Sequence, residues 1–402
     1  MRKALVAFLL LIVVLLAASC GEEASQPVVD TRVDDVTSVE EVTTTNIPIE
    51  EIAIDFDAIP LKIGFVKQDH HSAVFVAALR NEMMHAAYPV YLIPLGENFY
   101  ALVKDNRQIA EIEFIQSQGA INVPNNMQAG LFEMGFGGVV PFASSIDQGN
   151  PITILSPLHQ RGDMLVVEAG NDAVYDWDSF VNWVNTSEEP VVVGYKSPKA
   201  VALIIFQSAL RESGIPFAMS GGDIGGAMVV LYNAQGQPNL NPALQEGLVD
   251  AYVSNNPACA MAEHSGIGKC IAELSMLPPG DFENHPCCAI AATEEVIVAK
   301  PNEVAAALEL FVYATEFINE NPEEAAAAAS EWIGTPLEVE LVSMSTSLYD
   351  MHVTADWIRN MNIILDHMRG LNVFSGLLLM GADGATEIEM ITNFDLLPEE
   401  YR

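Results

Sequence analysis

Basic residues are scarce in this sequence. Its 402 residues include 17 lysines and arginines against 54 aspartates and glutamates, which gives a formal net charge of −37 at pH 7. Proteins that bind nucleic acid need a basic surface to meet the phosphates, so this balance excludes nucleic acid as an expected partner. The acidity bears on solubility and leaves the fold open.

Long apolar runs are absent after the first twenty residues, so no further membrane-spanning segment is expected. The start, MRKALVAFLLLIVVLLAASC, has a basic end followed by an apolar stretch that is too short for a spanning helix. This pattern predicts a signal peptide at residues 1–19. Its end, LAASC, resembles a bacterial lipobox, which implies lipidation of Cys20 and anchoring on the extracytoplasmic face of the cell membrane.

Residues 20–57 lack helical or strand periodicity and are rich in acid, threonine and valine. They predict a lipidated, acidic, disordered tether. About 345 residues follow, which is more than one hydrophobic core usually serves, so two lobes are expected.

Cysteines are few. Apart from Cys20 there are four: Cys259, Cys270, Cys287 and Cys288. In an extracytoplasmic protein these can be oxidised. A Cys259–Cys270 disulfide is slightly favoured, a pairing of Cys259 with Cys287 or Cys288 stays open, and so do free thiols. A Cys287–Cys288 bond is the least plausible because adjacent residues form a strained ring.

Recognised catalytic patterns are also missing. The sequence has no GxSxG, HExxH or P-loop motif, and its carboxylates are dispersed. We therefore expect a protein that is not an enzyme and needs no cofactor.

Short apolar runs alternate with helical patterns along the chain. Runs at 61–66, 89–95, 112–118 and 151–158 read as strands, and 73–87 reads as a helix. The alternation predicts an α/β fold with a mostly parallel sheet, whose ligands bind at the carboxyl ends of strands. In 189–215 a strand precedes Ser197 as a helix cap, with Pro198 at the first helical position.

Polar groups at predicted strand ends are the candidate ligand contacts. Asp69, His70 and His71 follow the first strand, and at least one histidine is expected at the cleft; the alternative is a capping aspartate with two solvated histidines. Gly137 and Gly138 allow a close backbone approach or form an ordinary turn. Tyr195, Lys196 and Ser197 lie where a helix begins, which favours an anion or marks a plain helix cap.

Asn255 and Asn256 follow another predicted strand, and His285 precedes the cysteine pair. With the histidines of the first loop, these segments offer a metal site as a weaker alternative, formed by His70, His71, Cys259, His285 and Cys287. Their spacing matches no recognised zinc pattern.

The order of segments resembles the substrate-binding proteins of ABC importers, in the branch for nitrate, sulfonate, taurine, bicarbonate and thiamine precursors. The resemblance covers nearly all of residues 58–402. It includes IGFVKQDHHSAVFVAA, MQAGLFEMGFGGVVPFASSIDQGNPITIL, VVVGYKSPKAVALIIFQSAL and NPALQEGLVDAYVSNNPACAMAEHSGIGKCI. Where the family commonly has Trp-Glu-Pro, this sequence has SNNPAC (254–259), so the usual acidic or aromatic contact is replaced by asparagines.

This resemblance implies a type II periplasmic-binding-protein fold with a helical C-terminal part. Lobe I would comprise 58–163 and 289–402 and lobe II 164–288, with crossing strands near 163–168 and 285–292. It further implies ligand contacts at Gln68 and Gln118. The expected protein is a monomer that captures a small organic or oxyanionic solute and delivers it to a permease and an ATPase.

Overall fold

The computed structural model describes residues 52–55, 57–380 and 386–402. The predicted signal peptide, the lipidation site Cys20 and nearly all of the predicted tether lie outside these residues. The described residues form one compact unit. No helix in the described ranges is both long enough and apolar enough to cross a bilayer.

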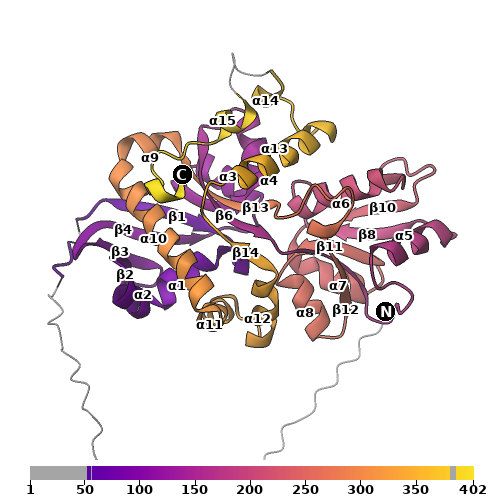
Figure 1. Cartoon of the computed structure of the whole chain (residues 1–402), viewed down its shortest axis with the longest axis horizontal. Helices are drawn as coiled ribbons and strands as arrows, with labels where there is room; N and C mark the ends of the chain where they lie inside the picture. The colour runs from indigo at the N-terminus through magenta and orange to yellow at the C-terminus, as the bar shows by residue number, and fades with distance from the viewer. Residues whose placement is uncertain (1–51, 56, 381–385) are drawn as a thin grey trace, which may run out of the picture. The chain divides into compact units, whose positions relative to one another are not determined.

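Eight strands form the larger sheet, in the order β14–β6–β13–β5–β1–β4–β3–β2 (Figure 1). Strand β1 lies inside it and runs parallel to both neighbours, β4 and β5. Leu61, Ile63 and Phe65 of β1 are buried, as the apolar run predicts. The strands are β1 (Pro60–Phe65), β2 (Val90–Gly96), β3 (Phe99–Lys104), β4 (Arg107–Gln116), β5 (Met134–Gly138), β6 (Ile152–Arg161), β13 (Pro286–Thr293) and β14 (Ser347–Tyr349).

Six strands form the smaller sheet, in the order β12–β7–β11–β8–β10–β9. Strands β8, β10 and β9 run parallel, and β11 joins β8 in the same direction. The strands are β7 (Asp163–Glu168), β8 (Val191–Tyr195), β9 (Phe217–Met219), β10 (Val229–Asn233), β11 (Ala251–Asn255) and β12 (Gly268–Glu273).

The prediction of a mostly parallel sheet is wrong for the larger sheet, where only β1 runs parallel to its neighbours. In the smaller sheet three of the five pairings are parallel, although that sheet is also mixed. Strands β2, β3 and β4 form an antiparallel meander. Asp105 and Asn106 join two of them with positive φ angles of 50° and 61°, the conformation of a two-residue hairpin turn. Strand β13 is antiparallel to β5 and β6, and β7 is antiparallel to β11 and β12.

Helices cover both sheets. Apolar residues of α1, α10 and α11 share one core with the larger sheet. Those of α3, α4, α5, α6 and α13 belong to a second core, which includes strands of both sheets. The helices of eight or more residues are α1 (Ser72–Leu79), α4 (Val139–Asp147), α5 (Trp177–Thr186), α6 (Val201–Glu212), α10 (Pro301–Glu320), α11 (Pro322–Ile333), α12 (Leu337–Ser345) and α13 (Ala355–Gly370).

Shorter helices connect these elements. The predicted helix 73–87 is interrupted at Arg80, whose ψ of 26° is not helical, so α1 and α2 are separate. The shorter α-helices are α2 (Asn81–Ala87), α3 (Asn122–Gln128), α7 (Leu240–Gln245), α8 (Ala258–His264), α9 (Glu294–Ala299), α14 (Leu377–Met380) and α15 (Glu387–Ile391); the 3-10 helices are η1 (Asp69–His71), η2 (Gln237–Asn239), η3 (Leu274–Met276) and η4 (Glu399–Tyr401).

The chain passes between the sheets at two places. Gly162 joins β6 of the larger sheet to β7 of the smaller one, and the return lies between β12 and β13. Helix α13 also touches the smaller sheet's layer, where Ser208 Oγ of α6 lies 2.8 Å from His367 Nδ1. The boundaries of lobe I and lobe II stay a prediction.

Candidate functional site

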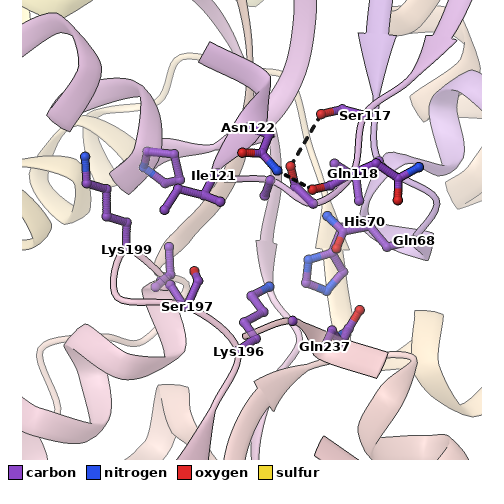
Figure 2. A pocket seen from close by; sticks show the side chains of 18 of the residues that line it. Gln68, His70, Ser117, Gln118, Ile121, Asn122, Lys196, Ser197, Lys199 and Gln237 are labelled. Carbon is purple, nitrogen blue, oxygen red and sulfur yellow. Dashed lines mark hydrogen bonds between the residues drawn. The ribbon is translucent and has the colours of Figure 1, made fainter. Parts of the chain in front are cut away.

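A cavity of about 750 Å³ is lined by residues from both sheets. Its first wall comes from the loop after β1, the segment 116–122 after β4, Gly138 and Pro141, and the start of β13. Its second wall comes from Asp163, the segment 196–201 after β8, and the segment 233–239 after β10. Most of these groups follow the carboxyl ends of strands, where α/β proteins commonly bind ligands. Figure 2 shows Lys196 and Ser197 on one wall and Gln68 and His70 on the other.

The cavity is basic although the protein is acidic. Three of the eight lysines in the sequence line it: Lys67, Lys196 and Lys199. In the described part of the chain these three form no ion pair within 4.0 Å. Three lysines outside the cavity do each pair with a glutamate: Lys62, Lys104 and Lys300. The cavity lysines therefore carry positive charge that no carboxylate of the described protein neutralises directly.

Asp163 is the only acidic side chain of the cavity lining that the structure describes. His285 Nε2 lies 2.9 Å from its Oδ2, and both side chains are buried. Burial alone would raise the pKa of Asp163, but the hydrogen bond and charge of His285 hold it below its ordinary value. The Asp163 carboxylate is thus already paired with His285, which does not itself line the cavity.

Lys196 follows β8 directly and donates a hydrogen bond to Asn255 Oδ1. Asn255 Nδ2 donates in turn to Gln68 Oε1 at 3.2 Å, which links the smaller sheet to the loop after β1. The Asn255 carbonyl accepts a hydrogen bond of 2.7 Å from Gln237 Nε2. These amides fix the position of the lysine and leave its charge facing the cavity.

The segment Ser197–Lys199 is a loop, which corrects the predicted helix start. Helix α6 begins at Val201 with Ala200 as its N-cap, so Ser197 is not the cap and Pro198 is not the first helical residue. The Ser197 carbonyl accepts the Ala200 N–H at 3.2 Å. Because the helix starts later than predicted, Ser197 and Lys199 lie at the cavity together with the first residues of α6. The free N–H groups at the start of a helix favour an anion. Burial lowers the pKa of Lys199, although the charge of Asp147 opposes this.

Six of the predicted contact residues line the cavity: Gln68, His70, Gln118, Gly138, Lys196 and Ser197. The sequence analysis missed several more polar groups that also line it: Lys67, Ser117, Asn122, Asp163, Lys199, Asn233, Gln235, Gln237 and Asn239. Proximity to a predicted strand end was an available signal for Lys67 and Lys199. The 233–239 segment had no such signal because β10 was not predicted.

Three predicted contacts from the loop after β1 and from β5 do not line the cavity. Asp69 accepts a hydrogen bond from Ser343 Oγ of α12 and so faces away. His71 Nδ1 accepts the Val66 N–H at 2.9 Å, which braces the loop from inside. At Gly137, an added Cβ would lie 2.7 Å from the Phe142 ring, so this glycine serves packing against α4.

The other predicted contacts lie behind the second wall. Tyr195 is buried in a core cluster, because successive residues of a strand point to opposite faces and Lys196 takes the cavity side. Asn256 Nδ2 donates to Thr346 Oγ1 at 2.9 Å. Asn255 and His285 act through Lys196 and Asp163 respectively. Neither lines the cavity itself.

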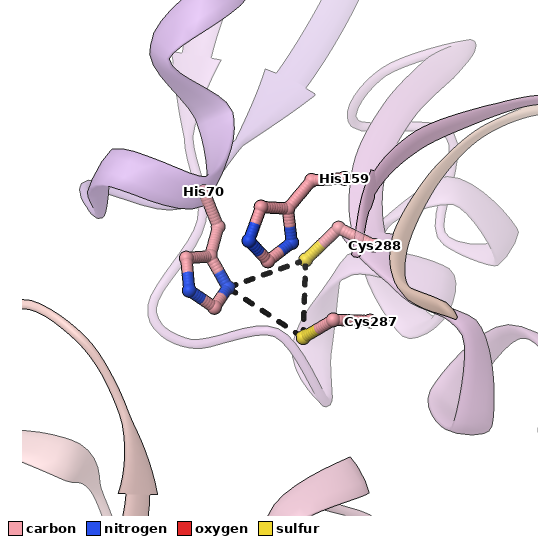
Figure 3. A group of neighbouring side chains, drawn as sticks. All are labelled: His70, His159, Cys287 and Cys288. Carbon is pink, nitrogen blue, oxygen red and sulfur yellow. Dashed lines mark hydrogen bonds between the residues drawn. The ribbon is translucent and has the colours of Figure 1, made fainter. Parts of the chain in front are cut away.

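A buried cluster of His70, His159, Cys287 and Cys288 adjoins the cavity (Figure 3). One ligand atom from each residue lies within 4.8 Å of the other three. His70 Nδ1 is 3.5 Å from Cys287 Sγ and 3.9 Å from Cys288 Sγ, and the two sulfurs are 3.9 Å apart. Three residues of the predicted metal set lie outside this cluster, namely His71, Cys259 and His285, and two members of the cluster were not in that set, His159 and Cys288.

The cluster favours one thiolate. The hydrogen bond with Cys287 holds the pKa of the Cys288 thiol well below its usual value against the effect of burial, and the nearby imidazoles of His159 and His70 add to this. Burial and the charge of His70 lower the pKa of His159 to about 3. A neutral imidazole and a thiolate are the protonation states that bind transition metals, and these shifts favour them at His159 and Cys288. The shifts of the other two residues are opposite: the hydrogen bond with Cys288 raises the pKa of Cys287, and Cys288 and the Asp69 charge raise that of His70 against the effect of burial.

The predicted Cys259–Cys270 disulfide is not formed in the structure, where both residues are free thiols. Cys259 is buried and its Sγ donates to the carbonyl of Ser254 at 3.3 Å. Cys270 lies in β12, and its N–H donates to Glu263 Oε1 at 2.8 Å. The loop that bears Asn255 and Asn256 is instead held by hydrogen bonds to Gln68, Gln237 and Thr346.

The profile of the NMT1-like family matches residues 57–334. This protein belongs to the NMT1-like family. The match confirms the predicted resemblance. No curated protein sequence matches the chain.

Solved structures similar to this NMT1-like protein confirm the predicted periplasmic-binding-protein fold. The ligand-binding component of an ABC-type import system from Staphylococcus aureus, with zinc bound, has a TM-score of 0.64 and 12% identity, covering 85% of this chain and 99% of that one. The aliphatic sulphonate binding protein SsuA from Escherichia coli has a TM-score of 0.58 and 14% identity, covering 83% of this chain and 97% of that one. The nitrate-binding protein NrtA from Synechocystis has a TM-score of 0.58 and 13% identity, covering 85% of this chain and 87% of that one.

Glu340 of this NMT1-like protein is buried close to Asp69, below the cavity loop. Burial, reinforced by the charge of Asp69, raises its pKa from 4.5 to about 8. Folding therefore takes up a proton between these two pH values, and stability falls as pH rises from about 4.5 through about 8. We expect Glu340→Gln to be more stable than wild type above pH 8, by at most about 5 kcal/mol.

Urea unfolding at pH 5 and pH 9 measures this difference. Glu338→Gln is the matched control because Glu338 lies exposed on the same helix. An equal stability gap between wild type and Glu340→Gln at both pH values would contradict the raised pKa.

Proposed function

We propose that the protein is the extracytoplasmic solute-binding component of an ABC importer and captures a small anion in its basic cavity. Membership of the NMT1-like family and the shared fold support the importer role. The single observation that carries the choice of an anion is the set of cavity lysines, Lys67, Lys196 and Lys199, without a carboxylate partner in the described chain. Capture of this kind needs no catalytic group and makes the protein a carrier, not an enzyme.

The size and chemistry of the cavity fit a small organic or inorganic oxyanion. Its volume of about 750 Å³ lies within the range of small-molecule sites. Amide and hydroxyl groups surround the lysines, including Gln118, Asn122 and Ser197. Such groups donate hydrogen bonds to nitrate, carboxylate or sulfonate oxygens. The proposed solute class is therefore that of nitrate, sulfonates, taurine and related anions.

The proposal includes the delivery route. The captured solute would pass to a permease and an ATPase, and a lipid on Cys20 would hold the protein at the outer face of the cell membrane as a monomer. An acidic surface with one basic cavity would direct anions to that cavity and repel them elsewhere.

A thermal-shift screen tests the anion assignment. The panel pairs each anion with a neutral compound of similar size: nitrate, ethanesulfonate and bicarbonate against small amides and alcohols, in buffer free of other sulfonates. Taurine is added as a sulfonate whose charge is balanced by its own ammonium group. A ligand at one hundred times its Kd should stabilise the folded protein by about 2.7 kcal/mol. We expect a rise in Tm with at least one anion and none with its neutral counterpart. Equal rises with the neutral compounds would refute the anion assignment.

A further inference from the structure

We propose that His70, His159, Cys287 and Cys288 form a tetrahedral site for Zn²⁺ in the inner wall of the cavity. This inference does not depend on anion capture, because a metal can occupy the four side chains whether or not a solute is present. It assigns a role to the one group of buried histidines and cysteines that the described structure brings within ligand distance of one another.

The distances among His70, Cys287 and Cys288 match the edges of a zinc tetrahedron. Zinc binds thiolate sulfur at about 2.3 Å and imidazole nitrogen at about 2.0–2.1 Å, so tetrahedral edges are about 3.8 Å between two sulfurs and about 3.6 Å between nitrogen and sulfur. The Cys287–Cys288 sulfur distance is 3.9 Å, and His70 Nδ1 lies 3.5 and 3.9 Å from the two sulfurs. These three donors need little movement to receive the ion, and the His159 donor lies within 4.8 Å of them.

Unsatisfied nitrogen atoms are a second, independent observation. His159 is fully buried, and neither of its ring nitrogens has a hydrogen-bond partner. Buried polar groups are normally hydrogen-bonded, and an exception calls for an explanation such as an ion. A metal bond to His159 would remove the cost of leaving this imidazole buried without any partner.

The backbone explains how two adjacent cysteines reach the same ion. Side chains of consecutive strand residues normally point to opposite faces. In β13 the register against β6 shifts on both sides of Cys288, and a bulge of this kind re-aims a side chain. His159 of β6 is the cross-strand neighbour of Cys288. His70 completes the set from the 3-10 helix after β1.

The donor types select the metal class. Two sulfurs and two nitrogens in a tetrahedron are typical of zinc, whereas magnesium and calcium prefer oxygen ligands. His70, Cys287 and Cys288 also line the cavity, which gives an ion a route to the site.

Metal titration of the purified protein tests the inference. Reduced, chelator-stripped protein is titrated with ZnCl₂ against a chromophoric chelator, in buffer without sulfonate, phosphate or the anion panel. We expect one tightly bound zinc per chain by elemental analysis. Replacement by Co²⁺ should give thiolate-to-metal charge-transfer absorption and the strong visible bands of a tetrahedral ion.

Matched variants locate the bound ion. Cys288→Ser and His159→Gln should each weaken zinc binding at least about 100-fold, since each removes one of four ligands. The controls Cys270→Ser and His264→Gln change the same residue types away from the cluster and should bind like wild type. Circular dichroism checks folding, and Cys287→Ser provides a further variant if Cys288→Ser does not fold.

Three outcomes would overturn the site. They are absence of zinc binding by reduced wild type, equal affinity in the Cys287→Ser/Cys288→Ser double variant, and a Cys287–Cys288 disulfide that persists in the reduced preparation by mass spectrometry. A zinc site with no anion response would refute the proposed solute alone, and an anion response without zinc would refute the metal site alone.

Discussion

Lys196→Gln is expected to weaken binding of the captured anion by about 10- to 150-fold. Lys196 lies at the end of β8, lines the cavity, and has no carboxylate within 4.0 Å in the described chain. A hydrogen bond to a charged group contributes about 1.5–3 kcal/mol, which corresponds to this range of affinity. Glutamine keeps a donor of similar length for Asn255 and removes the charge. Isothermal titration calorimetry with the anion that gives the largest thermal shift measures the loss.

Lys269→Gln is the control for the charge itself. Lys269 lies in β12, outside the cavity lining, and also has no ion pair in the described residues. Its replacement changes the net charge of the protein by the same amount and should leave the affinity unchanged. If both variants lost affinity equally, the effect would be a general electrostatic one and the cavity assignment would fail.

Gly162→Ala is expected to destabilise the protein by about 2–5 kcal/mol, the sum of two costs. Gly162 has a φ of +81°, which side-chain-bearing residues rarely adopt. A Cβ there would also lie 2.7 Å from Ser347 Oγ and 2.8 Å from His70 Nε2. Because Gly162 joins the two sheets, relief of this overlap must move β14, the His70 loop or the crossing itself. Urea unfolding followed by circular dichroism measures the change.

Gly266→Ala separates the two costs. Gly266 has a φ of +68° and no atom within 4 Å of the position a Cβ would take. This variant should therefore show the backbone cost alone, about 1–2 kcal/mol. If Gly162→Ala proved as stable as Gly266→Ala, the crossing between the two sheets would not be tightly packed. A loss of zinc affinity in Gly162→Ala alone would fit its closeness to His70.

The strand and loop around His70 could be predicted because they are encoded locally. The apolar run before Lys67 forms a buried strand, and the polar loop that follows lines the cavity. The same holds for β8 and Lys196. The start of α6 could not be predicted in the same way, because Ser197 and Pro198 match a helix cap by residue type. The helix actually starts at Val201, after a turn at Pro198 and Lys199.

His159 shows why the rest of the site could not be read from the sequence. It directly follows the run 151–158 that was predicted as a strand, and Gln160 comes after it, so nearness to a predicted strand end was a signal that was not used. The contact of His159 with Cys288 arises from the antiparallel pairing of β6 with β13, which no local pattern shows. The register shift that turns both cysteines toward it has no local sequence pattern. The predicted metal set failed for the same reason, since it joined histidines and cysteines by their nearness to strand ends.

A crystal structure of the protein with the highest-ranking anion tests the central claim most directly, because it shows where the solute binds. The proposed function predicts one anion in the cavity between the two sheets, with its oxygens within hydrogen-bond distance of Lys196 Nζ and of Lys67 or Lys199. Contacts to neighbouring amides such as Gln118 or Asn122 should complete its environment. An anion bound elsewhere, with only water around the three lysines, would contradict the account.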